Sequence, residues 1–178
     1  MGTEFTPEMA DNLASAYSNR GVTLRNQGRR EEAIGDYGRA IAIREELQKR
    51  LGAEFTPKMA DNLASAYTNR GNALGDQGRR EEAIGDYGRA IAMWEELQKR
   101  LGTEFTPEMA DGLARAYVFR GVFLYDSDPE SSKTSLRQGR EILCEIEAWF
   151  EGTLSESTKK LKGAFDRFLE DQNINLDT

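Results

Sequence analysis

The sequence predicts an all-α protein built from stacked antiparallel helix pairs. Residues 2–51 and 52–101 align without a gap and differ at nine of 50 positions, so 41 are identical. A third copy begins at Gly102 and matches through about Asp126. Apolar residues recur at steps of three and four inside each copy, with helix start and stop signals at the same places. Because one helix pair cannot cover its own apolar stripes, neighbouring pairs must stack.

The first helix of each copy begins with a clear start signal. Thr6 suits the N-cap, and Pro7 suits the first helical position. Gly28 is suited to the left-handed residue that follows a helix C-terminus, so the helix should end just before it. The apolar and small stripe between these signals consists of Ala10, Leu13, Ala14, Tyr17, Gly21 and Leu24.

A second helix is predicted from about Arg30 to Leu51. Acidic residues occupy its first turn and basic residues its last turn, which complements the helix dipole at both ends. Gly52 follows its end. Its buried stripe should consist of Ala33, Ile34, Tyr37, Ala40 and Ile41.

The C-terminal part departs from the repeat. A turn at residues 127–130 begins a helix that runs to about Glu151, and Thr153 with Glu156 forms a capping box for a last helix. Cys144 should be an inert, packed thiol. We therefore expect seven helices in one solenoid domain: repeats at 1–51 and 52–101, a divergent repeat at 102–151, a capping helix at 152–171 and a tail at 172–178.

The spacing of aromatic and small residues resembles that of a known family. Tyr17-x2-Arg20-Gly21-x2-Leu24, followed by Gly28, Ala33, Tyr37 and Ala40, resembles the signature of the tetratricopeptide repeat, and the second copy matches it again. The resemblance implies a right-handed solenoid whose first helices line a concave groove. The period of 50 exceeds the usual length of about 34 and is similar to the longer repeats of kinesin-light-chain-like members.

Arginine stands where this family usually has leucine, at Arg20, Arg70 and Arg120. We expect an ion pair inside each of the first two repeats, Arg20 with Asp36 and Arg70 with Asp86. The gap-free alignment places Leu136 at the equivalent acidic position of the third copy, so Arg120 needs another partner.

The resemblance assigns the groove to positions on the first helices. Four of the nine differences between the first two copies fall on these positions, while the packing positions look constant. This pattern indicates a recognition surface that varies from repeat to repeat. Random variation of exposed residues would produce the same pattern.

In the third copy we expect Phe123 to be covered by the C-terminal helices and Phe119 or Tyr125 to stay accessible. Only Asn69 and Arg115 fit the family's carboxylate-clamp pattern, so chaperone-tail binding is not expected. The predicted groove residues are Ser18, Val22, Arg25, Asn26, Asn69, Asn72, Asp76, Arg115, Val118, Phe119, Val122 and Tyr125.

Composition narrows the function. The chain has no histidine and one cysteine, which excludes histidine-based catalysis, an internal disulfide and a Cys-rich metal site. A net charge of −7 argues against nucleic-acid binding, and residues 102–178 hold 9 basic and 15 acidic side chains, so the acidity lies at the C-terminal end. With no signal peptide or membrane segment, we expect a cytoplasmic protein without cofactor or metal, and not an enzyme.

The predicted function is protein–protein interaction, with a peptide or helix of a partner bound in the groove. The alternative is an architectural spacer or self-associating rod, as a fragment of a larger repeat protein. The uncapped N-terminal end is then a candidate surface for homo-association, because the first repeat would expose apolar side chains.

Overall fold

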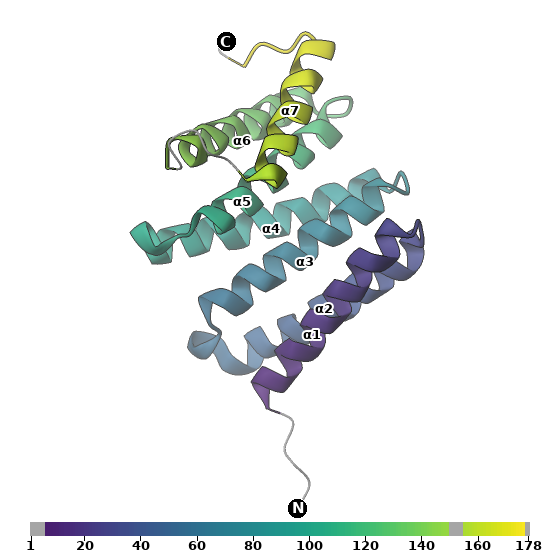
Figure 1. The fold of residues 1–178 in the computed structure, drawn as a ribbon, viewed down its shortest axis with the longest axis vertical. Coiled ribbons are helices and arrows are strands. Elements are labelled where there is room, and N and C mark those ends of the chain that lie inside the picture. Colours follow the sequence, from purple (N-terminus) through teal and green to yellow (C-terminus); the bar gives the residue numbers. More distant parts are fainter. Residues whose placement is uncertain (1–5, 150–154, 177–178) are drawn as a thin grey trace, which may run out of the picture. The chain divides into compact units, whose positions relative to one another are not determined.

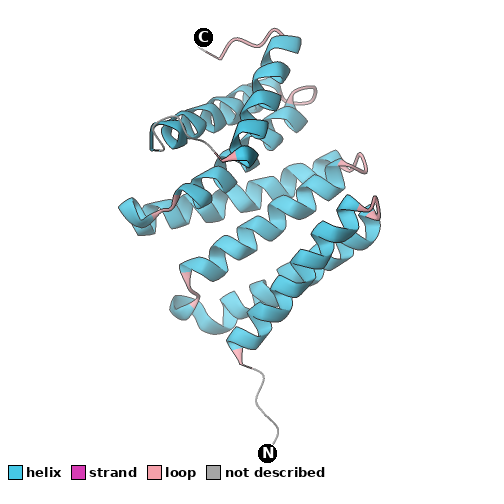
Figure 2. Ribbon diagram, viewed as in Figure 1, coloured by secondary structure: helices cyan, strands magenta, loops and turns pink. Residues whose placement is uncertain are grey.

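A computed structural model describes residues 6–149 and 155–176. Within those ranges the chain forms seven α-helices and two short 3₁₀ turns, and no strand (Figure 2). The prediction of an all-α helical-repeat fold is confirmed. The α-helices are α1 (Pro7–Asn26), α2 (Arg30–Leu51), α3 (Pro57–Gly75), α4 (Arg80–Leu101), α5 (Pro107–Leu124), α6 (Pro129–Trp149) and α7 (Glu156–Asp171).

The chain divides into two compact units, Met1–Leu97 and Gln98–Thr178. The first unit contains α1, α2, α3 and all but the last residues of α4, and the second contains α5, α6 and α7.

The predicted helix signals are confirmed at both ends of the first helices. The Oγ1 atoms of Thr6, Thr56 and Thr106 each accept a hydrogen bond from the backbone N–H three residues later, at 3.2, 3.2 and 3.4 Å. Gly28 adopts a φ of 78° just after α1, which a residue with a side chain rarely adopts. Gly78 does the same after α3, with a φ of 76°. Local sequence signals therefore set where all three first helices begin and where α1 and α3 end.

The core of the first unit is built on close helix crossings. A Cβ added to Gly21 would lie 2.7 Å from Cε1 of Tyr37, and one added to Gly71 would lie 2.9 Å from Cε1 of Tyr87. Each tyrosine ring thus fills the space that the missing side chain leaves. This is the packing that the small and aromatic positions predict, and in Figure 1 α1, α2 and α3 run side by side.

The second unit repeats this crossing with a different residue. A Cβ on Gly121 would lie 2.6 Å from Cγ of Leu136, so Leu136 occupies the place of Tyr37 and Tyr87. Ser135, which is 2% exposed, therefore takes the place of the aspartates. The gap-free placement of Leu136 at the acidic position was wrong by one residue, because α5 ends one residue earlier in its repeat than α3 does.

Two further predictions about the C-terminal part need correction. Ser155 caps α7 by accepting a hydrogen bond from the N–H of Thr158 at 3.1 Å, so Glu156 begins the helix and is not the third residue of a capping box. Thr153 lies outside the described residues. Cys144 is exposed on α6 and not packed.

Candidate partner-binding surface

The predicted groove residues of the first unit lie on α1 and α3, and some of them bind each other. Nε of Arg25 donates to Oδ2 of Asp76 at 2.7 Å, with both side chains 36% exposed. At the other end of these helices, Nδ2 of Asn62 donates to Oδ2 of Asp11 at 3.4 Å. The two contacts join the first repeat to the second and hold α1 beside α3.

Asn72, another predicted groove residue, is held by its own repeat. The hydroxyl of Tyr87 donates to Oδ1 of Asn72 at 2.8 Å. Burial raises the pKa of Tyr87, so the hydroxyl stays protonated and available as a donor. The hydrogen bond fixes the orientation of the Asn72 amide on the half-buried surface of α3.

Ser18 faces a buried arginine between α1 and α2. Arg44 is 2% exposed; its Nε donates to Oδ1 of Asp11 at 2.7 Å and its Nη2 to Oγ of Ser15 at 2.8 Å. Nη1 also reaches Oγ of Ser18 at 3.3 Å. Ser18 thus belongs to the interface inside the helix pair.

Trp94 is the counterpart of Arg44 in the second repeat. It is 1% exposed, and its indole N–H donates to Oδ1 of Asp61 at 3.0 Å. Thr68, the counterpart of Ser18, is 3% exposed. The expectation that packing positions are constant between the two repeats was therefore wrong, because three of the nine differences reach the core: these two and the one at Ala73, which is fully buried where the first repeat has Thr23.

What remains exposed on α1 and α3 is a small, mostly uncharged surface. Val22 is 42% exposed, Asn26 is exposed, and Asn69 is half-buried. Asn19 occupies on α1 the position that Asn69 occupies on α3, and within the described residues neither side-chain amide is hydrogen-bonded. Each amide has two donors and one acceptor to offer, which suits an extended backbone or another amide.

In the second unit, α7 covers the predicted residues of α5. Val118 is 3% exposed and shares a core cluster with Leu161 and Phe165 of α7. Phe119 and Val122 are partly buried against the same cluster. The third-repeat part of the predicted surface is thus occupied by the chain's own last helix.

Polar and aromatic contacts fix α7 at both of its ends. Nη2 of Arg115 donates to Oγ of Ser157 at 2.9 Å, and the hydroxyl of Thr158 donates to Oδ1 of Asp111 at 2.8 Å. Near the other end, the rings of Tyr125 and Phe168 meet edge to face with centroids 5.7 Å apart. Tyr125 and Phe119 are half-buried, and Phe123, expected to be covered, is half-buried as well.

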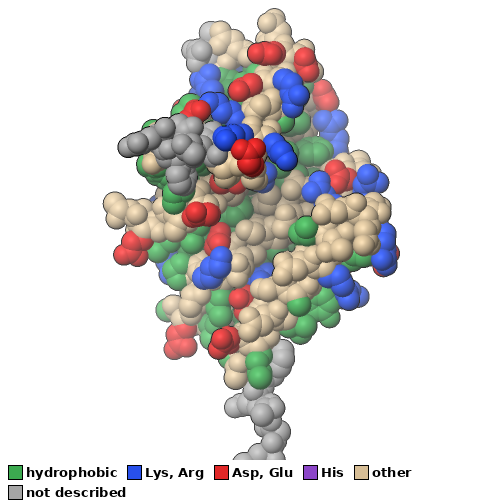
Figure 3. Space-filling view, viewed as in Figure 1, with side chains coloured by type: hydrophobic (Ala, Val, Ile, Leu, Met, Phe, Trp, Pro, Cys, Tyr) green, Lys and Arg blue, Asp and Glu red, His purple; other side chains and the backbone are tan. Residues whose placement is uncertain are grey.

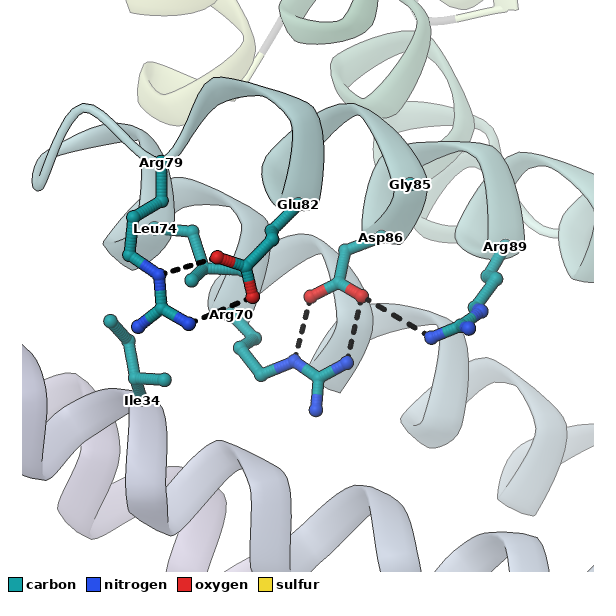
Figure 4. Close-up of a pocket in the computed structure, with 8 residues that line it drawn as sticks. All are labelled: Ile34, Arg70, Leu74, Arg79, Glu82, Gly85, Asp86 and Arg89. Atoms are coloured by element: carbon teal, nitrogen blue, oxygen red, sulfur yellow. Dashed lines mark hydrogen bonds and ion pairs between the residues drawn. The ribbon is translucent and has the colours of Figure 1, made fainter.

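The two predicted ion pairs are confirmed. Nη2 of Arg20 donates to Oδ1 of Asp36 at 2.7 Å, and Nε and Nη2 of Arg70 donate to the two oxygens of Asp86 at 2.7 Å each. The hydrogen bond from Arg20 lowers the pKa of Asp36. Figure 4 shows the second pair at the wall of a cavity of about 330 Å³, which Arg79, paired with Glu82, also lines. Each of the five charged groups in this cavity contacts a group of opposite charge within 4 Å, and the three arginines share two acids, because Arg70 and Arg89 both contact Asp86.

Arg120 has lost the partner of its counterparts. Its Nε is buried without a hydrogen-bond partner among the described residues.

The spacing of small buried residues in α6 matches that of α2. Ser132 and Gly139 are buried and lie seven residues apart, as Ala33 and Ala40 do in the first repeat. This spacing is the signal in the sequence that would have revealed the one-residue shift.

Two kinds of feature are absent from the described ranges. No group of three or more acidic or cysteine side chains there could hold a metal ion. None of the helices there is long and apolar enough to cross a membrane. On the face shown in Figure 3, basic and acidic side chains are interspersed, as the ion pairs require.

Antiparallel helix pairs that cross at a glycine and an aromatic ring define a helical-repeat protein. The family model described as tetratricopeptide repeat matches residues 13–47 and 63–97. The chain is a tetratricopeptide repeat protein over that part of its length. Proteins of this family are generally interaction modules and scaffolds without enzymatic activity. No curated protein matches the chain.

Proposed function

We propose that this chain is a protein-interaction module that binds a peptide or helix of a partner along the inner face of α1 and α3. The observation that carries this proposal is the pair of amides Asn19 and Asn69 beside the exposed side chain of Val22. Amides that make no hydrogen bond within the described residues, at matched positions on neighbouring helices, can bind a partner's backbone, while an exposed apolar residue provides contact area. The Arg25–Asp76 pair closes one end of this surface.

The predicted residues of the third repeat belong to the second unit. Val118 is 3% exposed in its core cluster, and Phe119 and Val122 are partly buried against the same cluster. The proposal therefore places the primary contact on the first unit.

A screen of an array of peptides against the purified chain tests this proposal. Val22→Asp and Asn69→Ala should each weaken binding of a selected peptide at least tenfold, because each removes one kind of contact. Glu46→Gln, at an exposed position of α2, is the matched control and should leave binding unchanged. Binding that survives both groove variants would refute the assignment.

Self-association is a second candidate function, and one observation favours it. Met9 is 47% and Leu13 is 42% exposed on α1. Such side chains can drive association of copies. Size-exclusion chromatography with light scattering over a dilution series tests this; a strict monomer at high concentration would count against it.

A further inference from the structure

The second unit contains a cavity with an exposed tryptophan in its wall. Trp149, the last residue of α6, is 51% exposed, whereas Trp94, the chain's other tryptophan, is 1% exposed. The cavity has a volume of about 470 Å³, and the residues that line it carry no charge: Gln98, Gly102, Thr103, Phe105, Pro107 and Trp149. They come from the end of α4, the turn that follows it, the start of α5 and the end of α6, and all of them belong to the second unit.

The lining of this cavity is partly apolar and partly polar. Phe105 is buried and Pro107 is half-buried, so the apolar part is held in place by the fold. The side chains of Gln98 and Thr103 are exposed and make no hydrogen bond within the described residues. An aromatic and apolar wall can hold the methylene stem of a long side chain, and amide and hydroxyl oxygens can accept hydrogen bonds from its tip.

The end of α6 has apolar residues where the second repeat has basic ones. With the one-residue shift of the third repeat, Ala148 and Trp149 stand at the positions of Lys99 and Arg100. Basic side chains in the last turn stabilise a helix through its dipole; α4 has both of them, whereas α6 has none. The helix thus lacks an ordinary stabilising feature at the point where it exposes an indole ring.

Acidic side chains flank the cavity. Glu145 is exposed one helical turn before Trp149, on the same face of α6. Glu104 and Glu108 are exposed next to lining residues, in the turn after α4 and at the start of α5. Within the described residues none of these three carboxylates has an ion-pair partner. The surroundings of the cavity therefore attract positive charge.

The same change of charge is found at the start of α5. Glu108 stands where the second repeat has Lys58. The positions of Lys58, Lys99 and Arg100 carry three positive charges in the second repeat, and their counterparts in the third carry one negative charge. Lys99 and Arg100 follow Gln98 in α4, but they lie roughly 100° and 200° around the helix axis from it, on other faces of the helix.

We propose that this cavity binds an arginine side chain of a basic segment in a partner protein, with the guanidinium group against the Trp149 indole. A cation over the face of a tryptophan is attracted by the charge distribution of the ring. A planar guanidinium group also stacks on aromatic rings and donates several hydrogen bonds, so arginine suits an indole beside amide and hydroxyl oxygens better than lysine does. The carboxylates of Glu104, Glu108 and Glu145 steer the basic segment to the site. This site is separate from the proposed groove and does not depend on it.

Titration of a short peptide into the chain labelled with ¹⁵N-tryptophan tests the proposal. The peptide is a capped heptapeptide with one central arginine between glycine and serine residues, and the comparison peptide has citrulline, an uncharged isostere, in its place. The arginine peptide should move the indole N–H signal of Trp149 in a saturable manner. The signal of the buried Trp94 should not move and is the internal control. The citrulline peptide should bind about fivefold more weakly, because it lacks the cation.

A matched pair of variants tests the acidic flank. Glu108 and Glu130 each follow the proline that begins a helix, α5 or α6, and both are exposed. Glu108→Lys restores the residue of the second repeat and should weaken binding of the arginine peptide about fivefold, because it reverses a charge beside the cavity. Glu130→Lys makes the same change of charge at the opposite end of α6 from Trp149 and should leave binding unchanged.

Three results would overturn the proposal. The first is equal binding of the arginine and citrulline peptides, which would mean that the occupant is uncharged. The second is a Trp149 signal that stays in place at millimolar peptide concentration. The third is an equal loss of binding in Glu108→Lys and Glu130→Lys, because the net charge of the chain and not the cavity would then attract the peptide.

Discussion

Leu136 packs against Gly121 where, in the first two repeats, a tyrosine ring packs against the equivalent glycine. The aliphatic residue needs no hydrogen-bond partner, whereas the Tyr87 hydroxyl has one in Asn72. The third repeat therefore keeps the close approach of its two helices while it loses the polar contact. Its counterpart of Asn72 is Val122, which packs into the apolar cluster under α7.

Gly121→Ala should destabilise the protein by about 1–3 kcal/mol, since a core without space must shift to admit a methyl group. The added Cβ would also lie 3.2 Å from the backbone N of Leu136, which a rotamer change cannot relieve. Chemical denaturation followed by circular dichroism measures the change. Gly163→Ala on α7, where no atom lies within 4 Å of the new Cβ, is the control and should be neutral or stabilising. Equal effects at the two glycines would contradict this packing.

Arg70 and Arg120 stand where the family usually has leucine, and replacing each by leucine should affect the stability of the protein differently. Arg70→Leu leaves Asp86, which is 3% exposed, with only the longer contact to Arg89 at 3.7 Å, and should cost about 3 kcal/mol. Arg120→Leu removes a buried Nε that has no hydrogen-bond partner, and should be neutral or stabilise by about 1 kcal/mol. Urea denaturation of the two variants side by side provides the comparison. A loss of stability at Arg120 as large as that at Arg70 would show that Arg120 has a partner.

The sequence predicts the helices and their crossings well. Thr, Pro and Gly begin or end a helix through contacts within a few residues, and the glycine–tyrosine pairs recur at a fixed spacing. The Arg20–Asp36 and Arg70–Asp86 pairs could also be predicted, since both partners lie inside one repeat. The surface could not be predicted as well. Whether Ser18 faces solvent depends on how far the Arg44 side chain reaches, and whether Val118 is covered depends on where α7 packs. These outcomes are set by contacts between helices and leave no periodic signal.

The stability of the protein should depend on pH through Asp36. The Arg20 hydrogen bond holds the pKa of Asp36 below its ordinary value of 3.8, so the folded state binds this proton less readily than the unfolded state does. The contribution is therefore present above the unfolded pKa and is lost as pH falls through the folded pKa. The difference in unfolding free energy between the native chain and Asp36→Asn should be constant from pH 6 to 8, where no histidine titrates, and should shrink below about pH 4.

Arg20→Gln is the companion variant for the pH experiment. It removes the guanidinium charge and its two-pronged contact with Asp36. The stability difference between Arg20→Gln and the Arg20→Gln, Asp36→Asn double variant should therefore shrink less in acid than the difference between the native chain and Asp36→Asn. The same acid dependence in both backgrounds would mean that another group governs it.

Arg44 and Trp94 occupy the same buried position in repeats that are otherwise nearly identical. Arg44 is satisfied by Asp11 and Ser15, whereas Trp94 needs only Asp61. Arg44→Ala would leave the Asp11 carboxylate without its cation and open a cavity.

Arg44→Ala should therefore cost about 3–5 kcal/mol, as breaking a buried pair does. Arg44→Trp combined with Ser18→Thr converts the core of the first repeat to that of the second and should cost less than about 1.5 kcal/mol, because the second repeat shows that nearly the same helices accommodate this combination. Arg39→Ala is the control, since its side chain is 59% exposed, and it should change stability by less than about 1 kcal/mol. Thermal and urea unfolding of the three variants distinguish these outcomes. If the double replacement is as damaging as Arg44→Ala, the buried ion pair is specific to the first repeat and its surroundings, and the two cores are not interchangeable.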